Sequence, residues 1–361
     1  MSWSFRIARI MGTDVKVHFT FLFLLAYQAF DGYGSGGQSG ALYEVALTVA
    51  VFVCVLLHEF GHILTARRFG IRTPDVILLP IGGLARLERM PEKPWQEFWI
   101  ALAGPVVTLV IALGLFGWLA LGGPLPWPLE VQGTGTRQFV LLLAVINAIL
   151  LGFNLIPAYP MDGGRVLRAV LATRLGMVKA TRIAARVGQT LAVGGGAWAL
   201  FASQPMLVLI ALFVYFAAGQ EASMVETRAA GKGIVVDQMM ITRFVTLPVY
   251  STLRQAVDLL LEGEQSEFPV VDNAGALEGL LTRDLLIRSL TDHGPEAPVS
   301  QAMARDVPAL PLGLSFEQAL GRLRASGFPA LPVVDTAGRL MGLLTLDNIT
   351  DLIMVRQAVT K

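Results

Sequence analysis

The segment HEFGH at residues 58–62 carries the side chains best suited to chemistry. If it is helical, His58 and His62 lie on one face, about 6 Å apart along the axis. Two imidazoles so placed can bind one zinc ion, and Glu59 can take a proton from a zinc-bound water. Apolar residues flank the segment on both sides, and ionisable groups in such surroundings are costly unless they are paired or bind a metal. The spacing therefore predicts a zinc site with Glu59 as general base.

A catalytic zinc site usually has a third protein ligand, and Asp162 is the best candidate. Pro157 and Pro160 precede it, and proline ends a helix because it lacks an N–H group and clashes with the preceding turn. We therefore expect Asp162 on irregular backbone at the cytoplasmic end of an apolar segment. Alternatively, Asp162 caps the following helix. His18 and His293 are rival ligands, the first near the start of an apolar segment and the second in a solvated loop.

Asn154 is a further candidate for a functional role. An amide at membrane depth can donate a hydrogen bond to the oxyanion of a tetrahedral intermediate or to a substrate carbonyl. A hydrogen bond between helices explains the residue equally well, and the same holds for Asn147. The residues alone leave both interpretations open.

These residues belong to a chain that is too apolar for a soluble globular protein. Hydrophobic residues make up 54% of its 361 residues, charged residues 15%, and the mean hydropathy is +0.61. The composition predicts an α-helical polytopic membrane protein with about six transmembrane helices. The expected spans are residues 15–30, 41–69, 98–121, 139–158, 183–201 and 205–222.

Lysine and arginine are concentrated in alternate loops between these apolar segments. This distribution predicts a multi-pass protein of the cell membrane with both termini in the cytoplasm. It also excludes a nucleic-acid-binding patch, because the basic residues are confined to short loops. The single cysteine, Cys54, can form no internal disulfide. The first apolar segment lacks a small-residue cleavage site, so we expect it to be retained.

Residues 73–94 are neither a span nor an ordinary polar loop. Apolar runs at residues 76–79 and 84–87 flank Gly82 and Gly83, a pattern typical of a short β-hairpin. Backbone of this kind at membrane depth must be covered by protein or face water. The sequence thus predicts a small membrane-associated hairpin.

An internal repeat occupies the C-terminal part of the chain. FPVVDNAGALEGLLTRD at residues 268–284 matches LPVVDTAGRLMGLLTLD at residues 331–347. Each copy predicts a lead-in strand, a helix, two strands around an Asp-x-x-Gly turn and a second helix. We expect the copies, at about residues 236–292 and 298–355, to pack face to face as one α/β module.

The change in composition predicts the domain organisation. Residues 1–228 should form the membrane domain, residues 229–233 a linker, and residues 234–361 the repeat module.

The membrane portion resembles the site-2 protease family of intramembrane zinc metalloproteases. The resemblance is carried, in order, by HEFGH, PIGGLARLE, the Ala-Gly-Pro of residues 103–105, and NLIPAYPMDGGR. One departure is visible, since this chain has Thr108 where the family often has asparagine.

This resemblance assigns roles to individual residues. It implies His58, His62 and Asp162 as ligands of one zinc ion, Glu59 as general base, and Asn154 as a contact of the substrate or oxyanion. It further implies that an extended substrate pairs with the hairpin near Gly82 and Gly83.

The repeat resembles a tandem pair of cystathionine-β-synthase (CBS) domains, which often bind adenine nucleotides and often dimerise. In nucleotide-binding members, an Asp that holds the ribose follows a Thr or Ser by three positions. Here Asp284 and Asp347 follow Thr282 and Thr345 by only two, and the usual places hold, in order, Leu285 and Asn348. Nucleotide binding and homo-oligomerisation therefore stay open, and a purely structural module is the alternative.

The resulting expectation is an intramembrane zinc metalloendopeptidase that acts on transmembrane or membrane-anchored proteins, with regulation through its CBS pair. One rival is a membrane transporter or channel gated by that pair, which would release its ion, whereas a protease would retain one zinc. A second rival is an inactive membrane scaffold, which would typically have lost Glu59 or a ligand.

Overall fold

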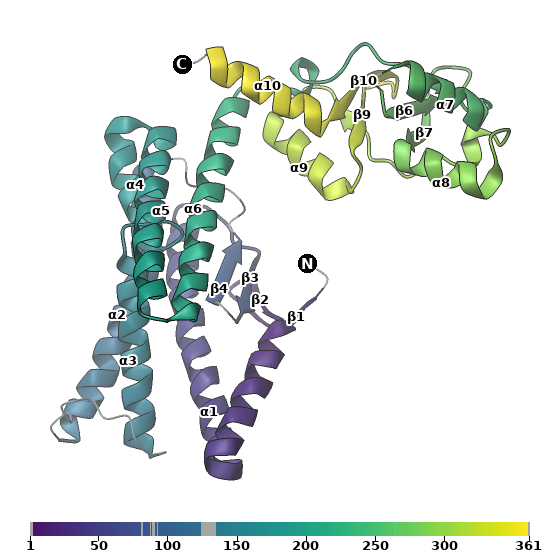
Figure 1. Ribbon diagram of the computed structural model, residues 1–361. Coiled ribbons are helices and arrows are strands. Elements are labelled where there is room, and N and C mark those ends of the chain that lie inside the picture. The colour runs from purple at the N-terminus through teal and green to yellow at the C-terminus, as the bar shows by residue number, and fades with distance from the viewer. Residues whose placement is uncertain are drawn as a thin grey trace. The chain divides into compact units, whose positions relative to one another are not determined.

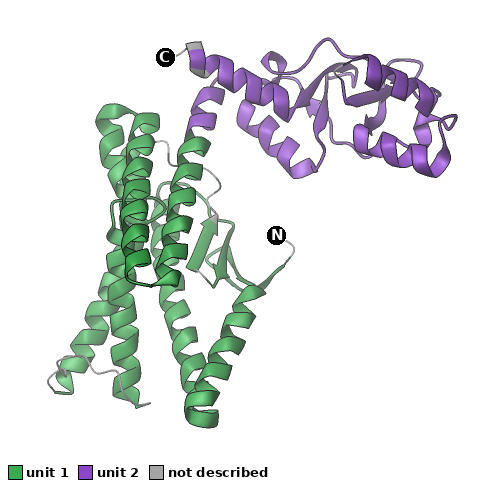
Figure 2. Ribbon diagram, viewed as in Figure 1, with its two compact units in different colours: residues 1–225 green, residues 226–361 purple. Residues whose placement is uncertain are grey.

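The computed structural model describes residues 3–80, 82–86, 88, 91, 93–123, 135–263 and 265–359. The chain divides into two compact units, Met1–Val225 and Glu226–Lys361, which we call the membrane unit and the CBS unit (Figure 2). Each has hydrophobic clusters of its own, so each is described separately.

The membrane unit combines long apolar helices with a small sheet (Figure 1). Among the described residues, four helices are long and apolar enough to cross a membrane, namely α1, α2, α3 and α6. This confirms the predicted helical membrane fold. The elements are β1 (Ser4–Ile10), β2 (Thr13–His18), α1 (Thr20–Arg68), β3 (Asp75–Leu79), β4 (Gly82–Arg86), α2 (Pro94–Leu121), α3 (Thr136–Leu155), α4 (Asp162–Leu175), α5 (Met177–Phe201) and α6 (Pro205–Gly231).

Helix α1 contains the first two expected spans. Gly36 and Gly37 leave helical geometry and divide α1 into two arms, which diverge from a turn in Figure 1. A side chain on Gly32 would lie 2.8 Å from the carbonyl carbon of Gly40. Glycine at both positions therefore permits the close backbone approach at this turn.

The membrane unit also contains a four-stranded sheet in the order β1-β2-β3-β4. The β3–β4 hairpin confirms the predicted one. Strand β2 corrects the start of the first span, because residues 13–18 are strand and helix begins only at Thr20. The reason is a two-residue alternation, in which Val15 and Val17 are buried while Lys16 and His18 are partly exposed.

Helix α2 holds the membrane unit together by packing against α1, α3 and α4. Small residues allow it to approach α1 closely. A side chain on Gly61 of α1 would lie 2.7 Å from the carbonyl oxygen of Ala103 in α2. This close packing brings the polar residues of α2 next to the HEFGH segment of α1.

The CBS unit consists of two copies of the predicted repeat. Each copy is a three-stranded sheet with two helices, as expected. The first comprises β5 (Leu247–Pro248), α7 (Leu253–Glu262), β6 (Glu267–Val271), β7 (Leu277–Thr282) and α8 (Arg283–His293), and the second β8 (Leu310–Pro311), α9 (Phe316–Ser326), β9 (Ala330–Val334), β10 (Leu340–Thr345) and α10 (Leu346–Val359).

The two copies complete each other's cores. Ile234 and Val236, which precede β5, pack in the core of the second copy with Phe316. Val299 and Met303, which precede β8, pack in the core of the first copy. Because each copy supplies apolar surface to the other, the pair forms one unit, in agreement with the predicted single module.

Candidate metal centre

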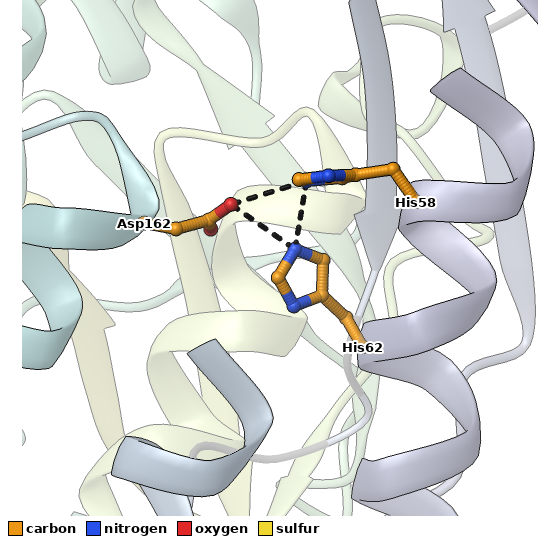
Figure 3. A group of neighbouring side chains, drawn as sticks. All are labelled: His58, His62 and Asp162. Atoms are coloured by element: carbon orange, nitrogen blue, oxygen red, sulfur yellow. Dashed lines mark hydrogen bonds and ion pairs between the residues drawn. The ribbon is translucent and has the colours of Figure 1, made fainter. Parts of the chain in front are cut away.

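Three side chains from two distant segments converge at one point (Figure 3). Asp162 Oδ2 lies 3.1 Å from His58 Nε2 and 3.2 Å from His62 Nε2, and the two Nε2 atoms are 3.1 Å apart. All three residues are buried, with exposed fractions of 8–9%. Two imidazole nitrogens and one carboxylate oxygen within 4.8 Å of one another can hold one metal ion.

The hydrogen bonds of the imidazoles show that both rings suit a cation. His62 Nδ1 lies 2.6 Å from the carbonyl oxygen of Ile100, which can only accept, so Nδ1 carries the proton and Nε2 a lone pair. His58 Nδ1 lies 2.9 Å from Thr108 Oγ1, whose own hydroxyl points toward the Gly104 carbonyl at 3.4 Å. This arrangement favours the same tautomer for His58. Two nitrogen lone pairs and a carboxylate then face one point, which is the donor set of a zinc site.

Helix α2 shapes the space around these donors. Ile100, Gly104 and Thr108 recur every four residues and so lie on one helix face. A side chain on Gly104 would lie 2.7 Å from His58 Nε2 and closer still to His62 Nε2. Only glycine therefore leaves the nitrogen atoms accessible to a metal ion.

Asp162 reaches the histidines because two glycines follow it. It is the first residue of α4, and Met161 occupies the N-cap position. Side chains on Gly163 and Gly164 would lie 2.5 Å from backbone atoms of Leu155 and Ala158, respectively. The close packing of α4 on the preceding turn thus directs the Asp162 carboxylate toward the imidazoles (Figure 3).

Glu59 and the β-hairpin meet beside this cluster. A side chain on Gly83 of β4 would lie 2.6 Å from Glu59 Cγ. Strand β4 is at the edge of its sheet, so Gly83 places an edge strand next to Glu59, whereas a side chain on Gly82 would meet no atom within 4 Å. Asn154 lies in the last turn of α3 and is half-buried.

The rival ligands lie elsewhere. His18 Nδ1 is 2.8 Å from Thr20 Oγ1 at the start of α1, and His293 ends α8 in the CBS unit. Within the described part of the chain, the group that could hold a metal ion comprises His58, His62 and Asp162.

Sequence reasoning missed the role of α2. Thr108 was noticeable only as a departure from the related pattern, yet it contacts His58. The carbonyl of Ile100 carries no sequence signal, because every residue has one. The four-residue spacing of Gly104 and Thr108 on an apolar helix was the available clue.

The residues of the CBS unit that were considered for nucleotide binding make local contacts. Thr282 Oγ1 accepts from the Leu285 backbone N–H at 3.3 Å, and Thr345 Oγ1 accepts from the Asn348 N–H at 3.1 Å. The side-chain amide of Asn348 donates to the Met239 carbonyl at 3.4 Å. These threonines therefore act as helix caps.

Acidic side chains also lie near Glu267 of the CBS unit. Burial raises the pKa of Glu267, and the negative charges of Asp347 and Asp284 raise it further. By contrast, hydrogen bonds from the Arg339 backbone and side chain and from the Ala337 N–H hold the pKa of Asp335 below its usual value.

Comparison with known proteins identifies the family. The profile of Peptidase family M50 matches residues 46–132 and 121–195, and that of the CBS domain matches residues 236–292 and 299–355. A zinc metalloprotease of Methanocaldococcus jannaschii is 34% identical over 78% of this chain and 78% of its own. A putative zinc metalloprotease of Synechocystis is 30% identical over 86% of this chain and 83% of its own.

Solved structures include a relative of the membrane unit. A site-2 protease from Methanocaldococcus jannaschii shares 35% identity and covers 61% of this chain and 95% of its own, with a TM-score of 0.47. The M50 match, together with the long alignment to a zinc metalloprotease, establishes the family. The chain belongs to peptidase family M50 and is a zinc metalloprotease with two C-terminal CBS domains.

Proposed function

We propose that the chain hydrolyses peptide bonds of transmembrane or membrane-anchored proteins at the cluster of His58, His62 and Asp162. The observation that carries this proposal is the convergence of two imidazole nitrogens and one carboxylate oxygen, all buried, beside Glu59. A zinc ion held there would activate water and polarise the scissile carbonyl. The same residues argue against an inactive scaffold, because the general base and all three ligands are present.

The chain's own side chains would handle the proton. Glu59 accepts it from the attacking water and passes it to the leaving amine, which is the role of a general acid–base residue. Asn154, in the last turn of α3, donates a hydrogen bond to the developing oxyanion or to a substrate carbonyl.

The substrate would bind as an extended strand along β4. This strand is at the edge of the sheet, and its Gly83 lies against Glu59. An added strand would therefore present its backbone beside the proposed base. A transmembrane helix must first unwind to adopt this form, so we expect weak helix formers near the cleavage site.

The membrane domain would comprise residues 1–228, joined by residues 229–233 to the CBS domains at residues 234–361. The arginine- and lysine-rich loops support a multi-pass arrangement in the cell membrane with both termini and the CBS pair in the cytoplasm. Adenine nucleotide binding and homo-oligomerisation through the CBS pair are part of the same proposal. Regulation of cleavage would follow from either.

Co-expression with candidate single-span proteins tests the catalytic role. Glu59→Gln should reduce cleavage by about 10²–10⁴-fold, the usual contribution of a general base, while zinc stays bound. Glu44→Gln, in the same arm of α1 but near the kink and 15 residues before Glu59, is the matched control and should cleave normally. Equal cleavage by the native chain and Glu59→Gln would contradict the proposal.

A further inference from the structure

A second buried polar cluster lies outside the proposed metal site. Arg168 of α4 is 3% exposed, and its Nε donates to Glu97 Oε1 of α2 at 2.7 Å. Its Nη2 bonds the same oxygen, and its Nη1 donates to Glu221 Oε1 of α6 at 3.0 Å. One guanidinium therefore joins three helices, which its forked geometry allows and a lysine would not.

The cluster is connected to the proposed metal site through two of these helices. Arg168 follows Asp162 by six residues on α4, which is about 9 Å along the helix axis. Glu97 precedes Ile100 by three residues on α2, and the Ile100 carbonyl contacts His62. The Arg168–Glu97 bond thus links the helix that carries the carboxylate ligand to the helix that orients both imidazoles.

The third helix leads into the CBS unit. Glu221 lies on α6, which continues beyond the boundary between the units at residues 225 and 226 and ends at Gly231. A side chain on Gly231 would overlap the ring of Phe316, which is 1% exposed in the core of the second CBS copy. Helix α6 therefore contacts Arg168 at one point and is packed within the CBS unit at its end.

The environment of Arg168 makes its position well defined. The ring of Tyr159 lies 5.1 Å from the guanidinium carbon, a cation–π contact. Removing one partner of a buried charge pair leaves the other without compensation, which is costly. Loss of either carboxylate should consequently shift Arg168, and with it α4.

We propose that Arg168 is a positioning residue that aligns Asp162 with His58 and His62, and that its bond to Glu221 gives α6 a direct influence on this alignment. The inference rests on the proposed role of Asp162 as a metal ligand. It identifies α6 as the route by which the CBS unit acts on the metal site.

Zinc affinity of the full-length protein tests the positioning role. It is measured by competition with a chelator, and Co²⁺ in place of zinc reports ligand geometry through its absorption spectrum. Arg168→Gln should weaken zinc binding about 10-fold, the low end of the loss seen when a group bonded directly to a ligand is removed, because Arg168 acts on Asp162 only through α4. It should also change the Co²⁺ spectrum. Arg168→Lys should not restore either property.

Glu221→Gln provides the milder test if Arg168→Gln does not fold. We expect a several-fold loss of zinc affinity, whereas Gln220→Ala, an exposed neighbour on α6, should have no effect. The positioning role is overturned if Arg168→Gln folds and keeps the native zinc affinity and Co²⁺ spectrum, even if its thermal stability is reduced. If only Glu221→Gln folds, the same result for that variant overturns it.

A double-mutant cycle tests the route through α6. Gly231→Ala places a methyl group against Phe316 and should lower zinc affinity when Glu221 is present. Combined with Glu221→Gln, it should have no further effect. Equal effects of Gly231→Ala in both backgrounds would overturn this route.

Zinc content and cleavage activity of the wild-type chain distinguish a failure of this inference from a failure of the proposed function. A wild-type chain that binds zinc but cleaves no membrane protein contradicts the function and leaves the zinc tests of Arg168 valid. A wild-type chain without zinc overturns both.

Discussion

The membrane unit and the CBS unit bury polar side chains in different ways. In the membrane unit, buried charged side chains face one another across helices, as Arg168 faces Glu97 and Asp162 faces the two histidines. In the described CBS unit, the buried polar side chains are Ser and Thr only. Thr282 and Thr345 bond backbone at helix starts.

The difference indicates where function resides. Burying a charge costs free energy unless a partner or a metal compensates, so buried charges persist mainly where they serve a purpose. A helix cap stabilises one element and has no such cost. We therefore expect substitutions of buried polar contacts to affect metal binding in the membrane unit and only stability in the CBS unit.

The largest effect is expected at Gly104. Gly104→Val would fill the space beside both Nε2 atoms and should abolish zinc binding. Gly114→Val, on the same helix with no atom within 4 Å of the added Cβ, is the matched control and should keep its zinc. Metal analysis of the two purified variants checks this, and zinc retention by Gly104→Val would contradict the geometry.

Thr108→Val should have the next largest effect. It removes the hydroxyl that contacts His58 Nδ1 while keeping the shape of the side chain. Zinc affinity should fall about 10–100-fold, and Thr108→Ser should restore most of it. Chelator competition measures both variants, and an unchanged affinity in Thr108→Val would show that the contact does not orient His58.

A helix cap of the CBS unit should behave differently. Thr252 Oγ1 accepts from the Gln255 N–H in a capping box at the start of α7. Thr252→Ala should lower the free energy of unfolding of the CBS unit by about 1 kcal/mol, with zinc affinity unchanged. Thr252→Ser keeps the acceptor and is the control. A loss of zinc in Thr252→Ala would contradict the expectation that such substitutions in the CBS unit affect only stability.

The smallest effect is expected for Glu267, and it depends on pH. Its pKa is raised in the folded state by burial and by Asp347 and Asp284, so the folded state binds this proton more tightly. Its contribution to stability is complete below the ordinary pKa of about 4.3 and is lost as the pH rises through the raised value. Glu267→Gln should therefore stabilise the CBS unit at pH 7 and make no such gain at pH 4.

Thermal unfolding of the wild type and of Glu267→Gln between pH 4 and pH 7 tests whether the substitution stabilises the CBS unit as the pH rises. A Glu267→Gln variant less stable than wild type at pH 7 would contradict the electrostatic argument.

Much of this fold follows from local patterns in the sequence. The CBS repeats were predictable because two copies of one pattern confirm each other, down to the turns at which Asp272 and Asp335 accept backbone N–H bonds. The cost of ionisable groups in apolar surroundings predicted a metal site at His58 and His62. Asp162 was expected to join them because a catalytic zinc site usually has a third protein ligand and because of the family resemblance.

The remaining features depend on tertiary contacts. Strand β2 was mistaken for the start of a span, although the alternation of Val15 and Val17 with polar residues was visible. Glu97 and Arg168 are 71 residues apart, and no spacing rule relates residues on different helices. Only the packing of α2 against α4 brings them together.

The metal content of the purified full-length protein, prepared without chelators, tests the central claim most directly. We expect one zinc ion per wild-type chain, and its loss when His58→Ala, His62→Ala and Asp162→Ala are combined. Absence of zinc from the wild-type protein, or equal zinc in the wild type and the triple variant, would contradict the assignment of these three side chains as the metal site.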